Sequence, residues 1–268
     1  PNVAAGQKVV VAVPGATVHP VSGEPFEIKK SKIRGEVSNG MICAEAEIGL
    51  GTSHAGVIVL PEETPVGTSV RDVYGIKDEV VFEIGLTPNR ADAASHFGVA
   101  RDLAAVIHVH HPEKNTVVSL PSVKELPSVS AQPISINVEA MEDCPRYSGL
   151  VIQGVEVKDS PDWLKNRLRS IGIGPINNIV DVTNYVLHEM GQPLHAFDAD
   201  RMKGNKVVVR KAHAGEAFVT LDHLERKLNV TDLMICNETD PMCTAGVFGG
   251  EKSGISSATK NVFLESAY

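Results

Sequence analysis

The segment from Asp181 to Asp198 constrains the fold more than any other, because a helical pattern, a clear end and a polar cluster follow one another in it. Apolar residues recur at helical spacing at Ile179, Val182, Val186 and Met190. Gly191 stands where a left-handed helix cap belongs, and Pro193 prevents the helix from continuing. The many β-branched residues also fit a buried strand, but the length of the segment and this punctuation favour a helix.

Chemically useful side chains lie in and just after this predicted helix. Thr183 and Asn184 lie within it, and His195 follows its end, where scaffolds commonly present chemistry. An isolated histidine beside a helix end is nevertheless more often a satisfied structural group than a catalytic base. The spacing alone therefore makes these residues candidates without assigning a reaction.

Composition indicates a globular chain with a substantial core and limits its partners. Its 268 residues are 43% apolar, enough for one large domain or two ordinary ones, and no apolar run approaches the roughly 20 residues that span a bilayer. A formal charge of -8 sets no strong field for nucleic acid, so such binding would need a local basic patch. The absence of a Cys-x-x-Cys pair argues against a zinc knuckle or disulfide framework and favours a reducing cytoplasm. Pro1-Asn2 at the start and an unfinished strand at the end are typical of a piece of a longer protein.

Residues 1–75 are predicted to be all-β and to form a small barrel or part of one. Short apolar runs bounded by glycine, proline and asparagine support this: Lys8 to Val13, Phe26 to Ile33, Gly40 to Ala44 and Val57 to Leu60. Four positive charges fall close together, at Lys29, Lys30, Lys32 and Arg34. Such a cluster suits a phosphate backbone, but a solvated strand face explains it equally well.

The rest of the chain is predicted to be α+β in several parts. Residues 76–111 combine a strand at Val80 to Leu86 with a helix at 93–107, which indicates a helix packed on a sheet. Prolines and serines mark residues 112–133 as a linker. Residues 134–268 mix strands and helices without a regular βαβ repeat, which favours an α+β domain over a doubly wound sheet. Its expected strands are Ile134 to Val138, Tyr147 to Val157, Lys206 to Lys211, Ala217 to Asp222, Leu233 to Cys236 and a final strand ending at Glu265.

A short helix at 161–171 is the clearest local prediction in this second domain. Ser160 is expected as its N-cap, Pro161 as its first residue and Gly172 as its end.

A glycine-rich segment near the end leaves two interpretations open. Gly246, Gly249 and Gly250 do not follow the strand-to-helix pattern of a phosphate loop. Glycine permits a ligand to approach main-chain NH groups closely, which could hold a developing oxyanion. Tight β-turns explain the same spacing, and spacing alone favours the turns.

Motifs in the first part resemble a known nucleic-acid-binding domain. They are Pro1 to Val9 (PNVAAGQKV), Ile28 to Gly35 (IKKSKIRG), Ser38 to Cys43 (SNGMIC) and Glu47 to Gly51 (EIGLG). These resemble the second half of the OB-fold tRNA-binding domain of several tRNA-handling proteins. The resemblance implies a partial barrel whose first half would precede Pro1.

Further motifs extend a resemblance over nearly the whole chain. They are LTPNRAD from Leu86, GVARDL from Gly98, CPRYSG from Cys144, PINNIVDVTNYV from Pro175, GQPLHAFD from Gly191 and LESA from Leu264. In this order they resemble the N-terminal half of the β subunit of bacterial phenylalanyl-tRNA synthetase. That family implies a B3/B4-type editing domain, which hydrolyses tyrosine wrongly attached to the phenylalanine tRNA, while aminoacylation occurs in the other subunit.

The resemblance assigns roles to individual residues as expectations. His195 and Asn184, with Thr183 nearby, would orient the attacking water and the ester. The main chain at Gly246, Gly249 and Gly250 would line the pocket, and Glu265 would accept a hydrogen bond from the tyrosine hydroxyl. The contact with tRNA expected of Lys29, Lys30, Lys32 and Arg34 rests on their clustered positive charge.

The resemblance also implies partners and cofactors. The expected partners are tRNA(Phe) and the synthetase α subunit, in an α2β2 heterotetramer in the cytoplasm. ATP and Mg²⁺ would serve the full synthetase, and this segment is expected to need neither a cofactor nor a metal.

The sequence departs from the family pattern at two positions. Gly174 stands where a basic residue is expected, which weakens any contact it would make to the tRNA end. His223 follows Asp222 where glycine is expected at a turn tip, so a distorted turn is anticipated.

Two functional hypotheses follow from these observations. The first is an editing hydrolase built on His195, Asn184 and Glu265. The second is a non-catalytic tRNA-binding and subunit-assembly module, indicated by the basic residues and the helix at 93–107. Loss of the ester from tyrosyl-tRNA discriminates between the two.

Overall fold

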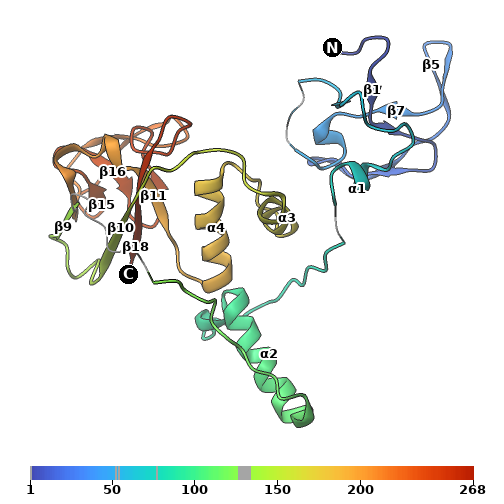
Figure 1. Ribbon diagram of the computed structural model, residues 1–268. Helices are drawn as coiled ribbons and strands as arrows, with labels where there is room; N and C mark the ends of the chain where they lie inside the picture. Colours follow the sequence, from blue (N-terminus) through green and yellow to red (C-terminus); the bar gives the residue numbers. More distant parts are fainter. Residues whose placement is uncertain (1, 52, 54, 77, 126–133) are drawn as a thin grey trace. The chain divides into compact units, whose positions relative to one another are not determined.

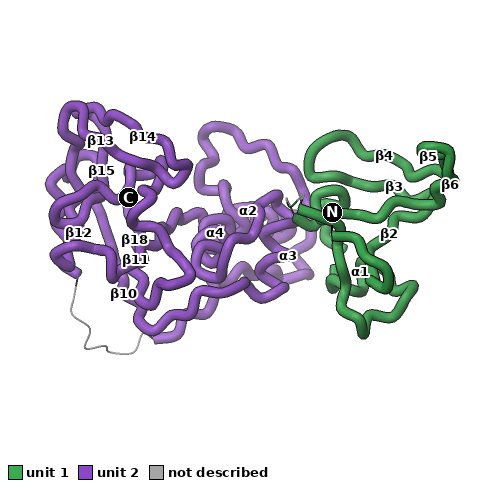
Figure 2. The backbone as a smooth tube through the Cα atoms, turned by 90° about the horizontal axis from the view of Figure 1, so that it is seen from above, with its two compact units in different colours: residues 1–80 green, residues 81–268 purple. Residues whose placement is uncertain are grey.

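The computed structural model describes residues 2–51, 53, 55–76, 78–125 and 134–268. The chain divides into two compact units, Pro1–Val80 and Val81–Tyr268 (Figure 2). The end of the predicted proline-rich linker, with Pro127 and Pro133, lies outside the described residues.

The first unit consists of short antiparallel strand pairs around a small core. Val10, Cys43 and Ile58 are buried at its centre. The pairs are β1 (Lys8–Val9) with β8 (Val59–Leu60), β2 (Val11–Ala12) with β7 (Met41–Ile42), β3 (Thr17–Val18) with β4 (Phe26–Glu27), and β5 (Ser31–Ile33) with β6 (Glu36–Ser38). A 3-10 helix at Glu45–Glu47 and the short α-helix α1 (Val70–Val73) complete the unit. Strands form in every run predicted for this part, but the described residues form separate two-stranded pairs, and a partial barrel is not confirmed.

The second unit begins without the strand predicted at Val80 to Leu86. This segment forms no sheet pairing, and Phe82 is 78% exposed. Alternating apolar residues fit one face of a strand, but a strand also requires a hydrogen-bonded neighbour, and no described residues pair with this segment. The strand prediction is therefore wrong.

Three α-helices follow among the described residues, and each begins or ends where local chemistry specifies it. They are α2 (His96–His110), α3 (Asp162–Ser170) and α4 (Asn178–Met190) (Figure 1). The Asn177 side chain caps the first turn of α4, and Gly191, with φ of 80°, ends it, which confirms the predicted helix and its glycine cap. Both α2 and α3 pack on α4. No helix among the described residues is both long enough and apolar enough to cross a membrane.

Ser160 has a different role from the N-cap predicted for it. Its hydroxyl donates to Asp181 Oδ2 at 2.5 Å, and the Ile176 amide donates to the other oxygen at 2.8 Å. Pro161 occupies the N-cap position of α3. Because Asp181 is fully buried in α4, its carboxylate outcompetes the helix end for the hydroxyl and ties α3 to α4.

Two sheets form the body of the second unit. The first has three antiparallel strands in the order β10 (Tyr147–Gln153), β18 (Asn261–Ala267), β11 (His195–Asp198). The second has the order β17 (Phe248–Gly249), β16 (Pro241–Thr244), β15 (Leu233–Cys236), β12 (Lys206–Lys211), β9 (Ser135–Val138). Only the β9–β12 pair is parallel among these ladders. The α+β class predicted from the irregular order of elements is confirmed.

The core lies between these sheets because both contribute buried apolar side chains to one cluster. Phe197 and Phe263 come from the three-stranded sheet, and Val207, Val209 and Ile235 come from the five-stranded sheet. The opposite face of the five-stranded sheet packs on a hairpin formed by β13 (Ala217–Val219) and β14 (Glu225–Lys227). Burial on both faces explains the consecutive valines Val207, Val208 and Val209 in the middle of β12.

Gly149 tests how tightly this core is packed. A Cβ atom at Gly149 would overlap the aromatic ring of Phe263. We expect Gly149→Ala to lower the free energy of unfolding by about 1–3 kcal/mol, because the ring must leave a packed position. Urea denaturation measures this, with Gly174→Ala as the control, since a Cβ atom at Gly174 meets no atom within 4 Å. Equal stability of the two variants would contradict the tight packing.

Candidate active site

The candidate site forms on the core-facing side of the three-stranded sheet. In the central strand β18, Glu265 lies opposite His195 of β11 on one side and opposite Gly149 of β10 on the other. Residues directly opposite one another in antiparallel strands project from the same face, with Cβ atoms about 5 Å apart. Strand register therefore places the imidazole and the carboxylate side by side, although they are far apart in sequence.

His195 is held at the start of β11 by its packing. Its ring centroid lies 4.5 Å from that of Phe197 in an edge-on arrangement. Burial lowers the pKa of His195 below its usual value. The imidazole is therefore uncharged at neutral pH and can accept a proton or a hydrogen bond.

Glu265 is a buried carboxylate with an unusual pKa. The side chain is only 8% exposed. Burial raises its pKa to about 7, while a hydrogen bond from the Tyr147 hydroxyl opposes this rise. Burial beside Glu265 also raises the pKa of Tyr147, so this phenol remains protonated and acts as a donor. The carboxyl group thus changes charge close to physiological pH.

Gly249 brings main chain against the imidazole. It lies in β17, the edge strand of the five-stranded sheet. A Cβ atom at this position would lie 3.0 Å from Cε1 and 3.2 Å from Nε2 of His195, and 3.0 Å from Cδ1 of Leu221. Only glycine permits this approach without displacing the ring.

The other two glycines predicted for the pocket have different surroundings. Gly246 is exposed in the turn between β16 and β17, with φ of 69° and open space where a Cβ atom would be. Gly250 is buried, and a Cβ atom there would lie 2.7 Å from the Met242 carbonyl oxygen and 2.8 Å from the Phe218 ring. Of the three, only Gly249 has His195 among the atoms nearest to a Cβ position, and the roles of Gly246 and Gly250 stay predictions.

Thr183 and Asn184 lie in α4, which packs beside β11 (Figure 1). The Thr183 hydroxyl donates to the Val180 carbonyl at 2.7 Å, so it is used within the helix. Asn184 is half-buried. In the described part of the chain, no hydrogen bond joins either residue to His195 or Glu265, and their roles stay predictions.

The basic residues predicted to contact tRNA lie together in the first unit. Lys32 is in β5, Arg34 is in the turn to β6, and Lys29 and Lys30 precede β5. All four are exposed, and Lys29 lies 3.8 Å from Glu27. Arg34 has a φ of 53° and Gly35 a φ of 92°, the conformation that a tight hairpin turn requires. The hairpin therefore presents positive charge to solvent.

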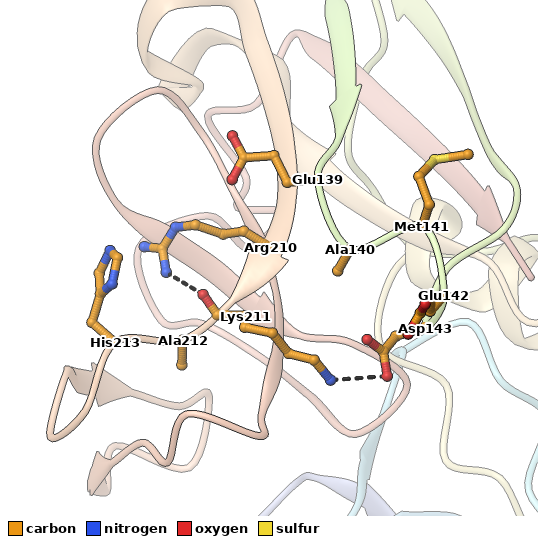
Figure 3. Close-up of a pocket in the computed structure, with 9 residues that line it drawn as sticks. All are labelled: Glu139, Ala140, Met141, Glu142, Asp143, Arg210, Lys211, Ala212 and His213. Atoms are coloured by element: carbon orange, nitrogen blue, oxygen red, sulfur yellow. Dashed lines mark hydrogen bonds and ion pairs between the residues drawn. The ribbon is translucent and has the colours of Figure 1, made fainter.

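A separate hollow of about 630 Å³ opens beside the ends of β9 and β12 (Figure 3). Its lining includes Asp143, Arg210 and Lys211. The charges are paired, because Lys211 Nζ lies 2.9 Å from Asp143 and Arg210 bonds Glu216 at 2.7 Å. None of the residues that line it is a predicted site residue.

The turn at His223, for which the sequence anticipates a distortion, keeps the backbone conformation that suits glycine. Its φ of 62° lies in the left-handed region that glycine normally occupies. The ring nitrogen Nδ1 lies 3.0 Å from Glu251.

Comparison with known proteins defines the class of domain that carries this site. The B3/4 domain family matches residues 143–268, a range that contains β10, β11 and β18. His195, Glu265, Gly249 and Tyr147 all fall inside it. The candidate site therefore lies within a B3/4 domain.

Relatives with similar sequences extend the match to the whole chain. The chain is 56% identical to the phenylalanine–tRNA ligase β subunit of Bacteroides fragilis over 269 residues, which cover 100% of this chain and 32% of that protein. It is 54% identical to the β subunit of Porphyromonas gingivalis and 46% identical to that of Geobacillus kaustophilus, covering 32% and 33% of them. The predicted resemblance is confirmed: the chain is a segment of the phenylalanine–tRNA ligase β-subunit family. It spans about a third of those relatives and not the predicted half.

A solved structure was also found among the similar proteins. It is an N-terminal fragment of the phenylalanyl-tRNA synthetase β subunit from Pyrococcus horikoshii, at 17% identity and a TM-score of 0.40. The match covers 67% of this chain and 52% of that one.

Proposed function

We propose that the B3/4 domain of this chain is an editing hydrolase that removes tyrosine from mischarged tRNA(Phe). The observation that carries this proposal is the cross-strand pairing of Glu265 with His195 on one face of the sheet. The Glu265 carboxylate, which can accept a hydrogen bond from a phenol, thereby lies beside the His195 imidazole, which can accept a proton from water. The tRNA substrate is inferred from the names of the relatives, and the hydrolytic reaction is inferred from the residues of the site.

Glu265 selects the substrate by its need for a hydrogen-bond donor. Tyrosine differs from phenylalanine only in its hydroxyl, which would donate to the carboxylate. Phenylalanine would leave a buried acceptor unpaired, which costs about 1–3 kcal/mol. Sites built to bond a hydroxyl generally reject the analogue that lacks it. The correctly charged tRNA is thus spared because it binds poorly.

His195 assists the hydrolysis of the ester. A water oxygen attacks the aminoacyl carbonyl carbon, the ester C–O bond breaks, and the tRNA leaves with its 3′-terminal hydroxyl restored. An uncharged imidazole can orient that water, take its proton and then return the proton to the leaving oxygen of the tRNA. Main chain at Gly249 lies against the imidazole and would line the space for the carbonyl group. Asn184 and Thr183 would position the ester.

A direct assay tests the proposal. The 268-residue chain is incubated with tyrosyl-tRNA(Phe) and, separately, with phenylalanyl-tRNA(Phe), and ester loss is measured in each case. We expect faster loss from the tyrosyl ester than from the phenylalanyl ester. Equal rates, or no loss above the rate without protein, would refute the editing function.

A second function, tRNA binding by the first unit, is favoured by the exposed basic hairpin. We propose that residues 1–75 are part of an OB-type domain whose Lys29, Lys30, Lys32 and Arg34 contact the tRNA backbone. In the full synthetase, an α2β2 assembly that uses ATP and Mg²⁺, the α subunit would carry aminoacylation. Binding that weakens steeply with salt, without deacylation, would favour this non-catalytic function alone.

Substitution of Gly249 tests the contact with the imidazole. We expect Gly249→Ala to reduce deacylation of tyrosyl-tRNA(Phe) about tenfold, because the new methyl group displaces the His195 ring by a few tenths of an ångström. Steady-state deacylation rates measure this. Gly254→Ala is the control, since a Cβ atom at Gly254 would touch Leu221 at 3.3 Å but not His195. Full activity of the Gly249 variant would remove Gly249 from the site.

A further inference from the structure

The partner that Glu265 already has is a phenol from the chain itself. The Tyr147 hydroxyl, from β10, donates to Oε2 of Glu265. Tyr147 and Glu265 are close neighbours on one face, because Tyr147 pairs with Ala267 and Gly149 pairs with Glu265 along the same two strands. Neither the helix pattern nor the glycine-rich segment indicated Tyr147, since only strand register brings it to the site.

The second carboxylate oxygen of Glu265 has no such partner. Tyr147 makes the one side-chain hydrogen bond to Glu265 within the described residues. Yet no fully buried side-chain polar atom there lacks a hydrogen bond. Oε1 therefore retains contact with the exterior and can accept a hydrogen bond from a ligand. One oxygen is thus bonded within the protein, and the other is left open to an outside donor.

We propose that Tyr147 is a specificity-determining positioning residue, which fixes one oxygen of Glu265 so that the other is presented, as part of a charged carboxylate, to the hydroxyl of a bound tyrosyl group. This inference rests on the proposed editing function. Tyr147 does not touch the reacting atoms and acts through Glu265. A carboxylate held in this way accepts hydrogen bonds only, and charged acceptors are costlier to leave unpaired than neutral ones. Tyr147 thereby sharpens the choice of tyrosine over phenylalanine.

The groups around Glu265 leave Tyr147 as the one that stabilises its charge. His195 faces it from β11 and is uncharged, because burial lowers its pKa. Cys144, before β10, and Cys243, in β16, interact with Glu265, and burial keeps both thiols protonated by raising their pKa, that of Cys243 to about 12. Loss of the Tyr147 hydroxyl therefore favours the protonated form of Glu265.

The test is Tyr147→Phe in the 268-residue chain, with deacylation of tyrosyl-tRNA(Phe) and phenylalanyl-tRNA(Phe) measured across pH. We expect the ratio of kcat/KM for the tyrosyl ester to kcat/KM for the phenylalanyl ester to fall about tenfold at pH 7.5. A change of this size is typical for the loss of one hydrogen bond to a charged group, here the bond from Tyr147 to Glu265. The acid limb of the tyrosyl profile is expected to move to higher pH. In a chain that carries Glu265→Gln, the added Tyr147→Phe should change the ratio no further.

A matched control and an independent readout keep the test decisive. Tyr185→Phe removes another tyrosine-to-glutamate hydrogen bond, from Tyr185 to Glu189 at 3.0 Å, and should leave the ratio and the pH profile unchanged. Carboxyl carbon NMR should show that the pKa of Glu265 rises in Tyr147→Phe. An unchanged ratio and an unchanged pKa of Glu265 would overturn the inference.

Failure of the proposed function gives a different result. A wild-type chain that does not deacylate tyrosyl-tRNA(Phe) would defeat the editing function, and the Glu265 titration would still show whether Tyr147 sets the charge. Should Tyr147→Phe not fold, 3-fluorotyrosine at position 147 provides the opposite change. Its more acidic phenol should move the acid limb to lower pH, and an unmoved limb would contradict the inference.

Discussion

Replacement of His195 by alanine is expected to slow the deacylation of tyrosyl-tRNA(Phe) by about 10²–10⁴-fold, the range typical for loss of a positioned acid–base group. The imidazole is the uncharged group beside Glu265 that can take a proton from water. Single-turnover deacylation measures the effect, with kcat reduced more than KM is raised. In the proposed function Glu265 binds the tyrosyl group, and this change leaves Glu265 in place.

The same variant distinguishes the two titrating groups. Burial lowers the pKa of His195, so protonation of the imidazole cannot produce an acid limb near pH 7, whereas Glu265, with a pKa of about 7, can. The residual deacylation rate of the His195→Ala variant should therefore still fall as the pH drops below about 7. His213→Ala, an exposed histidine in the hollow of Figure 3, is the control. A fully active His195 variant would exclude the imidazole from the reaction.

Replacement of Glu265 by glutamine is expected to reduce the preference for the tyrosyl over the phenylalanyl ester by about 10–100-fold. A neutral amide is less costly to leave unpaired than a buried carboxylate, so phenylalanine is rejected less strongly. The ratio of kcat/KM for the two esters measures this. In the wild-type chain the same ratio should fall as pH drops below 7, because protonation gives Glu265 a neutral form. The glutamine variant should show no such dependence.

Stability provides the control for this variant. The pKa of Glu265 is raised in the folded chain, so the unfolded chain loses the proton near its usual value of 4.5 and the folded chain only near 7. Folding is thus progressively disfavoured as pH rises from about 4.5 to 7, and the penalty remains above 7. Glu265→Gln should be more stable than wild type at pH 8, by about 1–3 kcal/mol, and similar at pH 4. A variant that gains stability while losing selectivity cannot have lost selectivity through unfolding.

The sequence predicted elements whose causes are local. The helix before Gly191 was predicted with its end because spacing, cap and proline all lie within a few residues. The strands at Lys206 to Lys211 and Leu233 to Cys236 formed as predicted because their apolar runs also find a partner, since the two strands pair with each other. Val80 to Leu86 failed because a strand depends on a partner elsewhere in the chain. Ser160 failed as a cap because a buried carboxylate competes for its hydroxyl.

The candidate site was predictable only through resemblance, because its geometry is set by strand register. Spacing left His195 and the glycines ambiguous, and the structure shows that a Cβ atom at Gly249 would meet the imidazole, whereas at Gly246 and Gly250 it would not. Tyr147 was missed although it stands in one of the quoted motifs. Its importance comes from a partner 118 positions away, and no local pattern carries such information.

The order of strands in the three-stranded sheet has a consequence for how the site is assembled during synthesis. β10 and β11 do not pair with each other; each pairs with β18, which lies between them and is made last of the three. While β18 has not yet emerged from the ribosome, β10 and β11 therefore have no partner in this sheet, and Glu265 is absent from the site. The ability to edit would therefore arise in a single late step, when β18 inserts between β10 and β11 and brings Glu265 beside Tyr147 and His195.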